Sequence, residues 1–292
     1  MKPVDRRDFL KLSGIAGVTF TAGLFPGADA FAQTAGDFHF VQISDTHWGF
    51  KGPPNPDAEH TLEKAIVTVN GLAQKPDCIV FTGDLTHTTE DGTERRARMK
   101  RFKEIVSELN VKDVRFLAGE HDASLDKGEA YKEFFGATHY TFDHKGVHFI
   151  ALDNVSDPGA KLGDEQLAWL AADLKQRKTD DRIVVLTHRP LFDLMPNWDW
   201  TTADGAKAID LLMPYTNVVV FYGHIHQENH HMTGHIAHHA AKSLIFPQAA
   251  PGGTAPRRPP PPPFDASLAP LGTRDIAMGA KVVLTEIPVT KA

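Results

Sequence analysis

Five short blocks of Asp, Glu and His residues carry side chains that bind transition metals. The blocks are Asp45-Thr46-His47, Gly83-Asp84, Gly119-Glu120-His121-Asp122, His188 and Gly223-His224-Ile225-His226. Carboxylate oxygen and imidazole nitrogen together suit zinc, iron or manganese. A carboxylate shared by two ions can hold them about 3.5–4 Å apart, so that both polarise one phosphoryl oxygen. No block is specific alone, but the five in succession predict a site for two metal ions.

Each block comes directly after an apolar run that predicts a buried strand. The expected strands are 38–44, 77–82, 114–118, 182–187 and 217–222, with a hairpin of 140–142 and 147–152 and a last strand at 281–287. Apolar residues at helical spacing predict helices over 57–72, 93–109, 129–135, 163–177 and 203–213. Strands that alternate with helices place their carboxyl ends at one edge of a sheet, where ligands from distant positions converge.

In this order, the blocks resemble the calcineurin-like metallophosphoesterase family, and the likeness covers nearly all of the chain after residue 30. Residues 146–153 and the helix with Trp169-Leu170 resemble the branch that includes class III cyclic-nucleotide phosphodiesterases. The resemblance implies an α/β fold of two mixed β-sheets packed face to face and flanked by helices. It also implies a hydrolase that acts on phosphate mono- or diesters through a hydroxide bridging two divalent or mixed-valence ions of iron, manganese or zinc.

The resemblance also implies which residues bind the metals. It assigns Asp45, His47 and His226 to the first ion, His188, His224 and Glu120 to the second, and Asp84 to both.

Two further residues match the family's proton donor and its partner. The resemblance implies that His121 protonates the leaving oxygen, with Asp122 orienting its ring. His87 follows the bridging Asp84 by three residues, where one branch carries a metal-binding tyrosine. Both a further ligand and a histidine outside the coordination sphere remain open for His87.

Glu120 departs from the family pattern, which has an asparagine at this position. Two unit charges about 4 Å apart interact by roughly 4 kcal/mol at a surface-like dielectric. An ionised Glu120 would therefore bind metal more firmly and repel an incoming phosphate. A higher-valent ion, a less anionic substrate, or loss of phosphate-ester hydrolysis would each reconcile this charge with the site.

Histidines are unusually dense after the last ligand block. The segment holds His224, His226, His230, His231, His235, His238 and His239, of which the family pattern uses two. The others fit either solvated loop and strand residues or an accessory copper or zinc site, because imidazole suits both metals.

The first thirty residues predict an export signal. Arg6-Arg7 and Phe9-Leu10-Lys11 begin it, a weakly apolar stretch covers about 12–25, and Ala28-Asp29-Ala30 is a small-x-small cleavage site. The paired arginines resemble a twin-arginine signal, which implies the twin-arginine export machinery as a partner and a periplasmic or secreted protein. The alternative is an amphipathic helix or membrane anchor, but the stretch is shorter than the roughly 20 residues that span a bilayer.

Composition places the remainder among globular α/β proteins. The chain has 292 residues, 41% apolar and 23% charged, which suits one large domain over 31–292. A net charge of −6 offers no basic footprint for nucleic acid. Cys78 is the single cysteine, so no disulfide forms within the chain. Five consecutive prolines within 247–270 predict a long surface loop.

Two hypotheses of different classes follow. The first is an exported dinuclear metallohydrolase that cleaves a small-molecule phosphate ester. The second is a metal-binding protein on the same scaffold, which handles or senses copper or iron with little hydrolysis. The second requires the additional histidines to hold ions of their own.

Overall fold

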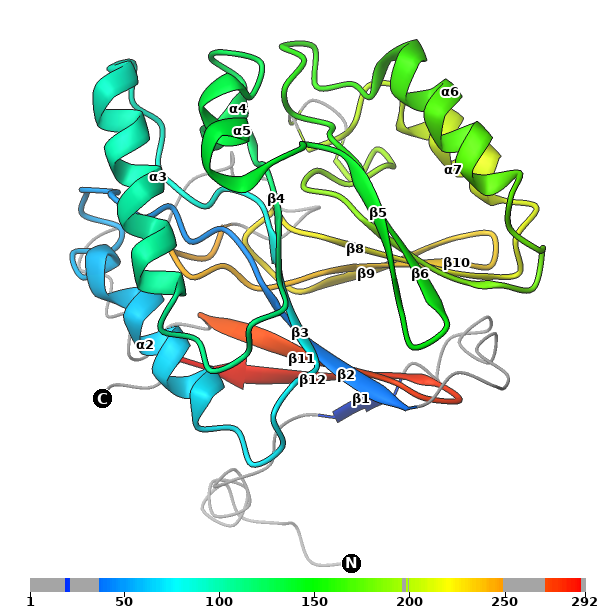
Figure 1. The fold of residues 1–292 in the computed structure, drawn as a ribbon, viewed down its shortest axis with the longest axis horizontal. Coiled ribbons are helices and arrows are strands. Elements are labelled where there is room, and N and C mark those ends of the chain that lie inside the picture. The colour runs from blue at the N-terminus through cyan, green and yellow to red at the C-terminus, as the bar shows by residue number, and fades with distance from the viewer. Residues whose placement is uncertain (1–18, 22–36, 196–197, 199, 249–270, 290–292) are drawn as a thin grey trace, which may run out of the picture.

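Figure 1 shows the computed structural model, which describes residues 19–21, 37–195, 198, 200–248 and 271–289. Two six-stranded sheets pack between two groups of helices, as expected from the sequence. In chain order the elements are β1 (Thr19–Thr21), β2 (Phe38–Ile43), α2 (Ala58–Asn70), β3 (Cys78–Thr82), α3 (Gly92–Val106), β4 (Val114–Leu117), α4 (Glu120–Ala123), α5 (Glu129–Phe135), β5 (Tyr140–His144), β6 (Val147–Ala151), α6 (Gly163–Leu174), β7 (Arg182–Leu186), α7 (Gly205–Leu212), β8 (Asn217–Tyr222), β9 (Asn229–Thr233), β10 (Ile236–Ala240), β11 (Gly272–Met278) and β12 (Val282–Pro288).

Both sheets are mixed. The first has the strand order β1-β12-β11-β2-β3-β4, in which β2, β3 and β4 are parallel and the other pairs antiparallel. The second has the order β5-β6-β7-β8-β10-β9, with β6, β7, β8 and β10 parallel. The parallel strands of each sheet therefore deliver their carboxyl ends to a common edge.

Apolar side chains from the inner faces of the two sheets form the central core. Phe40 of β2 meets Phe149 of β6 and Phe221 of β8 edge to face, each with ring centroids 5.7 Å apart. Such ring pairs add to the stabilisation from burial. The sheets are thereby held face to face.

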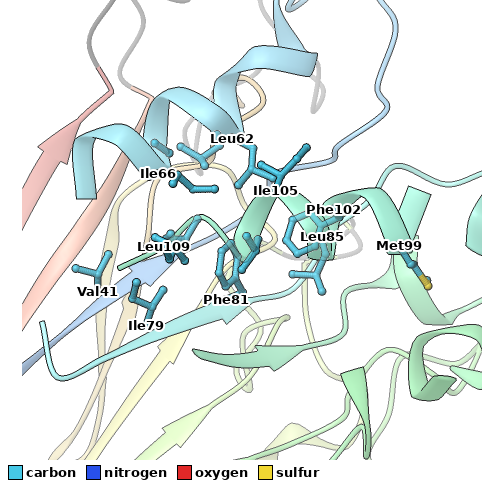
Figure 2. Packing of buried hydrophobic residues seen from close by; sticks show 14 of the residues in the cluster. Val41, Leu62, Ile66, Ile79, Phe81, Leu85, Met99, Phe102, Ile105 and Leu109 are labelled. Atoms are coloured by element: carbon cyan, nitrogen blue, oxygen red, sulfur yellow. The ribbon is translucent and has the colours of Figure 1, made fainter. Parts of the chain in front are cut away.

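Helices cover the outer face of each sheet. Figure 2 shows Leu62 and Ile66 of α2 and Phe102 and Ile105 of α3 gathered around Phe81 of β3. Each fully buried side chain of this kind stabilises the fold by about 1.5–3 kcal/mol. On the other side, α6 and α7 pack on the second sheet in a separate apolar cluster. The layers therefore run helix, sheet, sheet, helix.

The structure adds strands that the sequence did not predict. β9, β10 and β11 lie in the part expected to be irregular, and α4 begins within the third ligand block. Helix α3 covers Gly92–Val106 rather than 93–109, and Asp91 caps it by accepting a 2.8 Å hydrogen bond from the backbone N of Thr93. Most of the proline-rich segment, 249–270, is outside the described residues.

Part of the expected export signal belongs to the first sheet. β1 pairs antiparallel with β12, with Thr19 opposite Thr285 and Thr21 opposite Val283. Arg6-Arg7 and the expected cleavage site at Ala30 are outside the described residues. Cleavage there would remove β1 and leave β12 as an edge strand.

Candidate metal centre

The predicted ligand blocks meet where parallel strands of the two sheets end. Asp45 and His47 follow β2, Asp84 follows β3, and Glu120 is the first residue of α4 after β4. In the second sheet, His188 follows β7, and His224 and His226 follow β8. The structure thus brings together all the predicted ligands: Asp45, His47, Asp84, Glu120, His188, His224 and His226.

One group of four buried side chains fits the first metal. The ligand atoms of Asp45, His47, Asp84 and His226 lie within 4.8 Å of one another. Nε2 of His47 is 3.3 Å from Oδ2 of Asp84 and 3.2 Å from Nε2 of His226. Nε2 of His226 is 3.4 Å from Oδ1 of Asp45. Nitrogen and oxygen donors converging at this spacing suit iron, manganese or zinc.

A second group fits another ion beside the first. It consists of Asp84, Glu120, His188 and His224, again within 4.8 Å. Glu120 uses both oxygens, with Oε2 2.8 Å from Nε2 of His188 and Oε1 2.9 Å from Nδ1 of His224. Oε2 of Glu120 and Nε2 of His188 are both buried from solvent. Asp84 belongs to both groups, which is the position of a bridging carboxylate.

The charges of the second group favour a cation. Burial opposes protonation of His188, but the carboxylates of Asp84 and Glu120 outweigh burial and raise its pKa well above the ordinary value. Burial likewise disfavours the carboxylate of Glu120, but His224 and His188 outweigh it and lower the pKa. A bound cation would supply the positive charge that the carboxylates attract onto His188. The donor set therefore fits a metal.

Hydrogen bonds from outside the two groups orient the ligands. Nδ1 of His188 lies 2.7 Å from the carbonyl oxygen of Thr82, and Nδ1 of His226 lies 2.9 Å from that of Phe246. A carbonyl can only accept, so each Nδ1 carries the proton and each Nε2 is left as a metal-binding lone pair. Asp45 accepts from the hydroxyl of Ser44 at 2.6 Å.

Most of the predicted ligands have an unusual backbone conformation. Their φ angles are positive: 52° for Asp45, 42° for His47, 50° for Asp84, 66° for His224 and 54° for His226. Residues other than glycine adopt this left-handed region at a cost of about 1–3 kcal/mol each, and such strain collects at functional sites. In the turns after β2, β3 and β8 this strained conformation directs the ligand side chains toward one another.

Glycines before two of the ligands permit close approach. A Cβ atom on Gly119 would overlap the carboxylate and backbone nitrogen of Asp84. A Cβ on Gly223 would overlap the hydroxyl of Ser44 and lie 2.8 Å from Oδ2 of Asp45. Any larger residue would displace the carboxylates from the centre.

The expected proton donor faces the centre, but its partner differs from the expectation. Nδ1 of His121 accepts from the backbone N of Thr88 at 3.2 Å and lies 2.7 Å from the Thr88 hydroxyl. A backbone N–H can only donate, so the proton of the neutral ring is on Nε2, which is 4.0 Å from Oδ2 of Asp84. The ring therefore presents an N–H to the metal pair.

Asp122 does not orient His121. Its oxygens accept from the backbone N atoms of Leu85, Thr86 and Gly119, each at 2.9 Å. The expected contact between Asp122 and the His121 ring is not formed, because the Asp122 side chain points from the short helix α4 toward the turn that follows β3. Burial, reinforced by Asp84, raises the pKa of Asp122 to about 6. The residue fixes the two loops that carry the bridging carboxylate and the proton donor.

His87 is beside the first group. Its Nδ1 is 3.3 Å from Nδ1 of His47, and its ring stacks on that of His121 with centroids 4.9 Å apart. His47, His87 and His121 form a third group with ligand atoms within 4.8 Å. Burial lowers the pKa of His87 to about 4, so its ring is neutral at physiological pH. Both expected roles, ligand or neighbour, remain compatible with this position.

The additional histidines form no comparable group. In the β9–β10 hairpin, Nδ1 of His230 is 2.7 Å from Nδ1 of His239, and the ring of His231 stacks on Phe192 with centroids 3.8 Å apart. Nε2 of His235 lies 2.7 Å from the carbonyl oxygen of Tyr215. Within the described part of the chain, no set of three metal-binding side chains includes these residues.

Sequence reasoning did not identify two residues of the centre. Thr88 holds His121, and a lone threonine in a loop gives no signal of that role. Arg189 directly follows His188, and its Nη2 is 3.8 Å from Oε1 of Glu120. The adjacency of Arg189 to a ligand was visible in the sequence, but its side-chain direction was not.

No helix in the described part of the chain combines the length and the apolar character that crossing a membrane requires.

Comparison with known proteins agrees with the geometry. A probable glycerophosphodiester phosphodiesterase of Arcobacter nitrofigilis is 28% identical over 202 residues, which cover 64% of this chain and 71% of that protein. A 3',5'-cyclic adenosine monophosphate phosphodiesterase of Pseudomonas aeruginosa is 28% identical over 225 residues, covering 73% and 78%.

Solved structures share the fold. A dimetal phosphatase from Danio rerio superposes with a TM-score of 0.57 at 15% identity, covering 87% of this chain and 99% of that one. A purple acid phosphatase from yellow lupin gives a TM-score of 0.60 at 13% identity, covering 88% and 51%. The model of the family described as calcineurin-like phosphoesterase matches residues 38–228, which include every predicted ligand. The chain belongs to the calcineurin-like phosphoesterase family.

Proposed function

We propose that this chain, a metal-dependent phosphoric ester hydrolase by family, acts on phosphodiesters. The observation that carries the proposal is the pair of ligand groups sharing Asp84, with Glu120 in the second group. When bound, the two metals supply Lewis-acid chemistry that polarises the phosphoryl oxygen and activates water. The surrounding side chains would select the charge of the substrate and assist departure of the leaving group.

The charge of Glu120 favours a diester over a monoester. A phosphodiester carries one negative charge and a monoester nearly two at neutral pH, so the carboxylate repels the monoester more strongly. Arg189, 3.8 Å from Glu120, offsets part of the repulsion. Relatives named as phosphodiesterases support this preference.

His121 is the proposed acid. Thr88 holds its Nδ1 as an acceptor, so Nε2–H faces Asp84 and the metal pair. As water attacks phosphorus and the ester bond breaks, Nε2–H would donate a hydrogen bond to the leaving oxygen and stabilise the negative charge that develops there. The contact with Thr88 and the stacking on His87 hold the ring in this position.

Turnover assays test the proposal. The chain from residue 31 is loaded with iron, manganese or zinc and assayed with bis-p-nitrophenyl phosphate and p-nitrophenyl phosphate. We expect a higher kcat/KM for the diester. With metal content retained, His121→Ala should lose far more activity toward a diester with an alkyl leaving group than toward bis-p-nitrophenyl phosphate, whose leaving group needs no proton. No turnover with any of these metals would reject hydrolysis, and a preference for the monoester would reject the charge argument.

We also propose that the chain is exported to the periplasm or secreted by a twin-arginine route, on the basis of Arg6-Arg7 and the segment that follows. Expression of the full chain, followed by cell fractionation, should yield a shortened exported protein. Arg6→Lys with Arg7→Lys should retain it in the cytoplasm, whereas Lys2→Arg should not. Equal export of both variants would contradict this route.

A further inference from the structure

A continuous series of aromatic rings borders the first metal group. The ring of His87 stacks on His121 at 4.9 Å and meets Phe50 edge to face at 5.0 Å. Phe50 in turn meets Phe246 at 5.5 Å, and Phe246 is 5.2 Å from His226. We call His87, Phe50 and Phe246 the aromatic wall. It extends from the proposed proton donor to a ligand of the first group.

Hydrogen bonds and close packing hold the wall in place. The buried Asn55 donates from Nδ2 to the carbonyl oxygen of Ile245 at 2.7 Å, which joins the loops that carry Phe50 and Phe246. The carbonyl of Phe246 accepts from His226 at 2.9 Å. Gly52 lies under the Phe50 ring, and a Cβ there would be 2.6 Å from the ring. The wall is thus organised before any substrate arrives.

The wall is accessible as well as ordered. Phe50 and Phe246 are half-buried, and 27% of the His121 side chain is exposed. Phe50 also lines a cavity of about 500 Å³ formed by its own loop and the start of α2, which includes neither His87 nor Phe246. The subsite therefore rests on the exposed parts of the rings themselves.

We propose that the aromatic wall binds a planar aromatic ester group of the phosphodiester substrate. The inference rests on the proposed function and adds the chemical class of the substrate. A ring seated against Phe50 or Phe246 at centroid distances of about 4.5–7 Å makes the contacts that aromatic pairs prefer. Its ester oxygen would then lie on the side of the centre where His121 can donate a proton. An alkyl ester would make no such ring contact with Phe50 or Phe246.

Calorimetry with stable diester mimics tests this subsite. Phenyl methylphosphonate and ethyl methylphosphonate carry the same single charge and differ in one ester group. We expect the metal-loaded protein to bind the phenyl compound about 10-fold more tightly, as one or two ring contacts give. Phe50→Leu and Phe246→Leu should each reduce this ratio, because they weaken binding of the phenyl compound more than binding of the ethyl compound. The control is Phe134→Leu on α5, which should keep the full ratio.

The outcome separates this inference from the proposed function. Equal affinities for the two compounds in the parent protein would overturn the aromatic subsite even if diesters are hydrolysed. A ratio that survives Phe50→Leu combined with Phe246→Leu would overturn the assignment to the wall. Because binding is measured without turnover, a tight phenyl-selective complex would support the subsite even in a preparation that hydrolyses nothing. Metal content and circular dichroism confirm that each variant is folded and loaded.

Discussion

Replacing Glu120 with asparagine should weaken the second metal site. Both oxygens of Glu120 are within 2.9 Å of imidazole nitrogens of that group. Unit charges about 4 Å apart interact by about 4 kcal/mol at an effective dielectric of 20. The amide carbonyl of asparagine can still ligate the ion and reduces the net loss to about 2–3 kcal/mol, or about 30- to 150-fold in the dissociation constant of the second ion.

Competition with a metal-binding dye measures this change for manganese or zinc. The affinity of the first ion should change much less, because Asp45, His47 and His226 are untouched. The same variant should show a lower KM for bis-p-nitrophenyl phosphate, since the charge that repels phosphate is gone. Glu120→Gln separates charge from length because it keeps the side-chain length. If both variants bind two ions as tightly as the parent, Glu120 is not a ligand and the charge argument is refuted.

Three further predictions concern the surroundings of the centre. Thr88→Val removes the hydroxyl that holds His121, so it should lower kcat several-fold for an alkyl leaving group but little for p-nitrophenolate, which needs no proton. The control variant Thr89→Val should change neither rate, and equal losses for both leaving groups would contradict a positioning role for Thr88. Gly119→Ala should lower the free energy of unfolding by about 1–3 kcal/mol and reduce metal content, because the Cβ of the new alanine would overlap Asp84. Gly71→Ala is the control in thermal unfolding, and an unchanged melting temperature of the Gly119→Ala protein would contradict the overlap. Burial raises the pKa of the Cys78 thiol to about 12, so the thiol should resist thiol reagents at pH 8 until the protein unfolds, and rapid labelling of the native protein would contradict this. The free energy of unfolding should fall as pH rises above about 9, because there only the thiol of the unfolded chain ionises.

The sequence predicted the parallel strands and the convergence of the ligands for one physical reason. Apolar runs such as Cys78–Thr82 can be buried on both faces only as central strands, and a polar residue directly after such a run must be at the sheet edge. Asp84 therefore had a predictable position. The ligand clusters could be identified because each followed a strand.

The parts that were missed depend on partners distant in sequence. Arg274 is fully buried in β11, where it forms an ion pair with Glu286 on β12. Because a charged residue in the middle of a segment normally argues against a buried strand, β11 could not be predicted without knowing this partner. His238 and His239 are buried in β10, which pairs in parallel with β8. Asp122 binds backbone groups after β3 rather than its sequence neighbour, which only the three-dimensional arrangement reveals.

The left-handed backbone at the ligands constrains how this sequence can change over evolution. The ligand turns keep their shape because they link strands that form the core, whether or not a metal is used. A lineage that abandoned its metals would no longer need Asp or His at positions 45, 47, 84, 224 and 226, but would still need residues that tolerate positive φ. Glycine and asparagine are the residues that do so at least cost. Their enrichment at these positions in a related chain would therefore mark a metal site that was lost while the fold was kept.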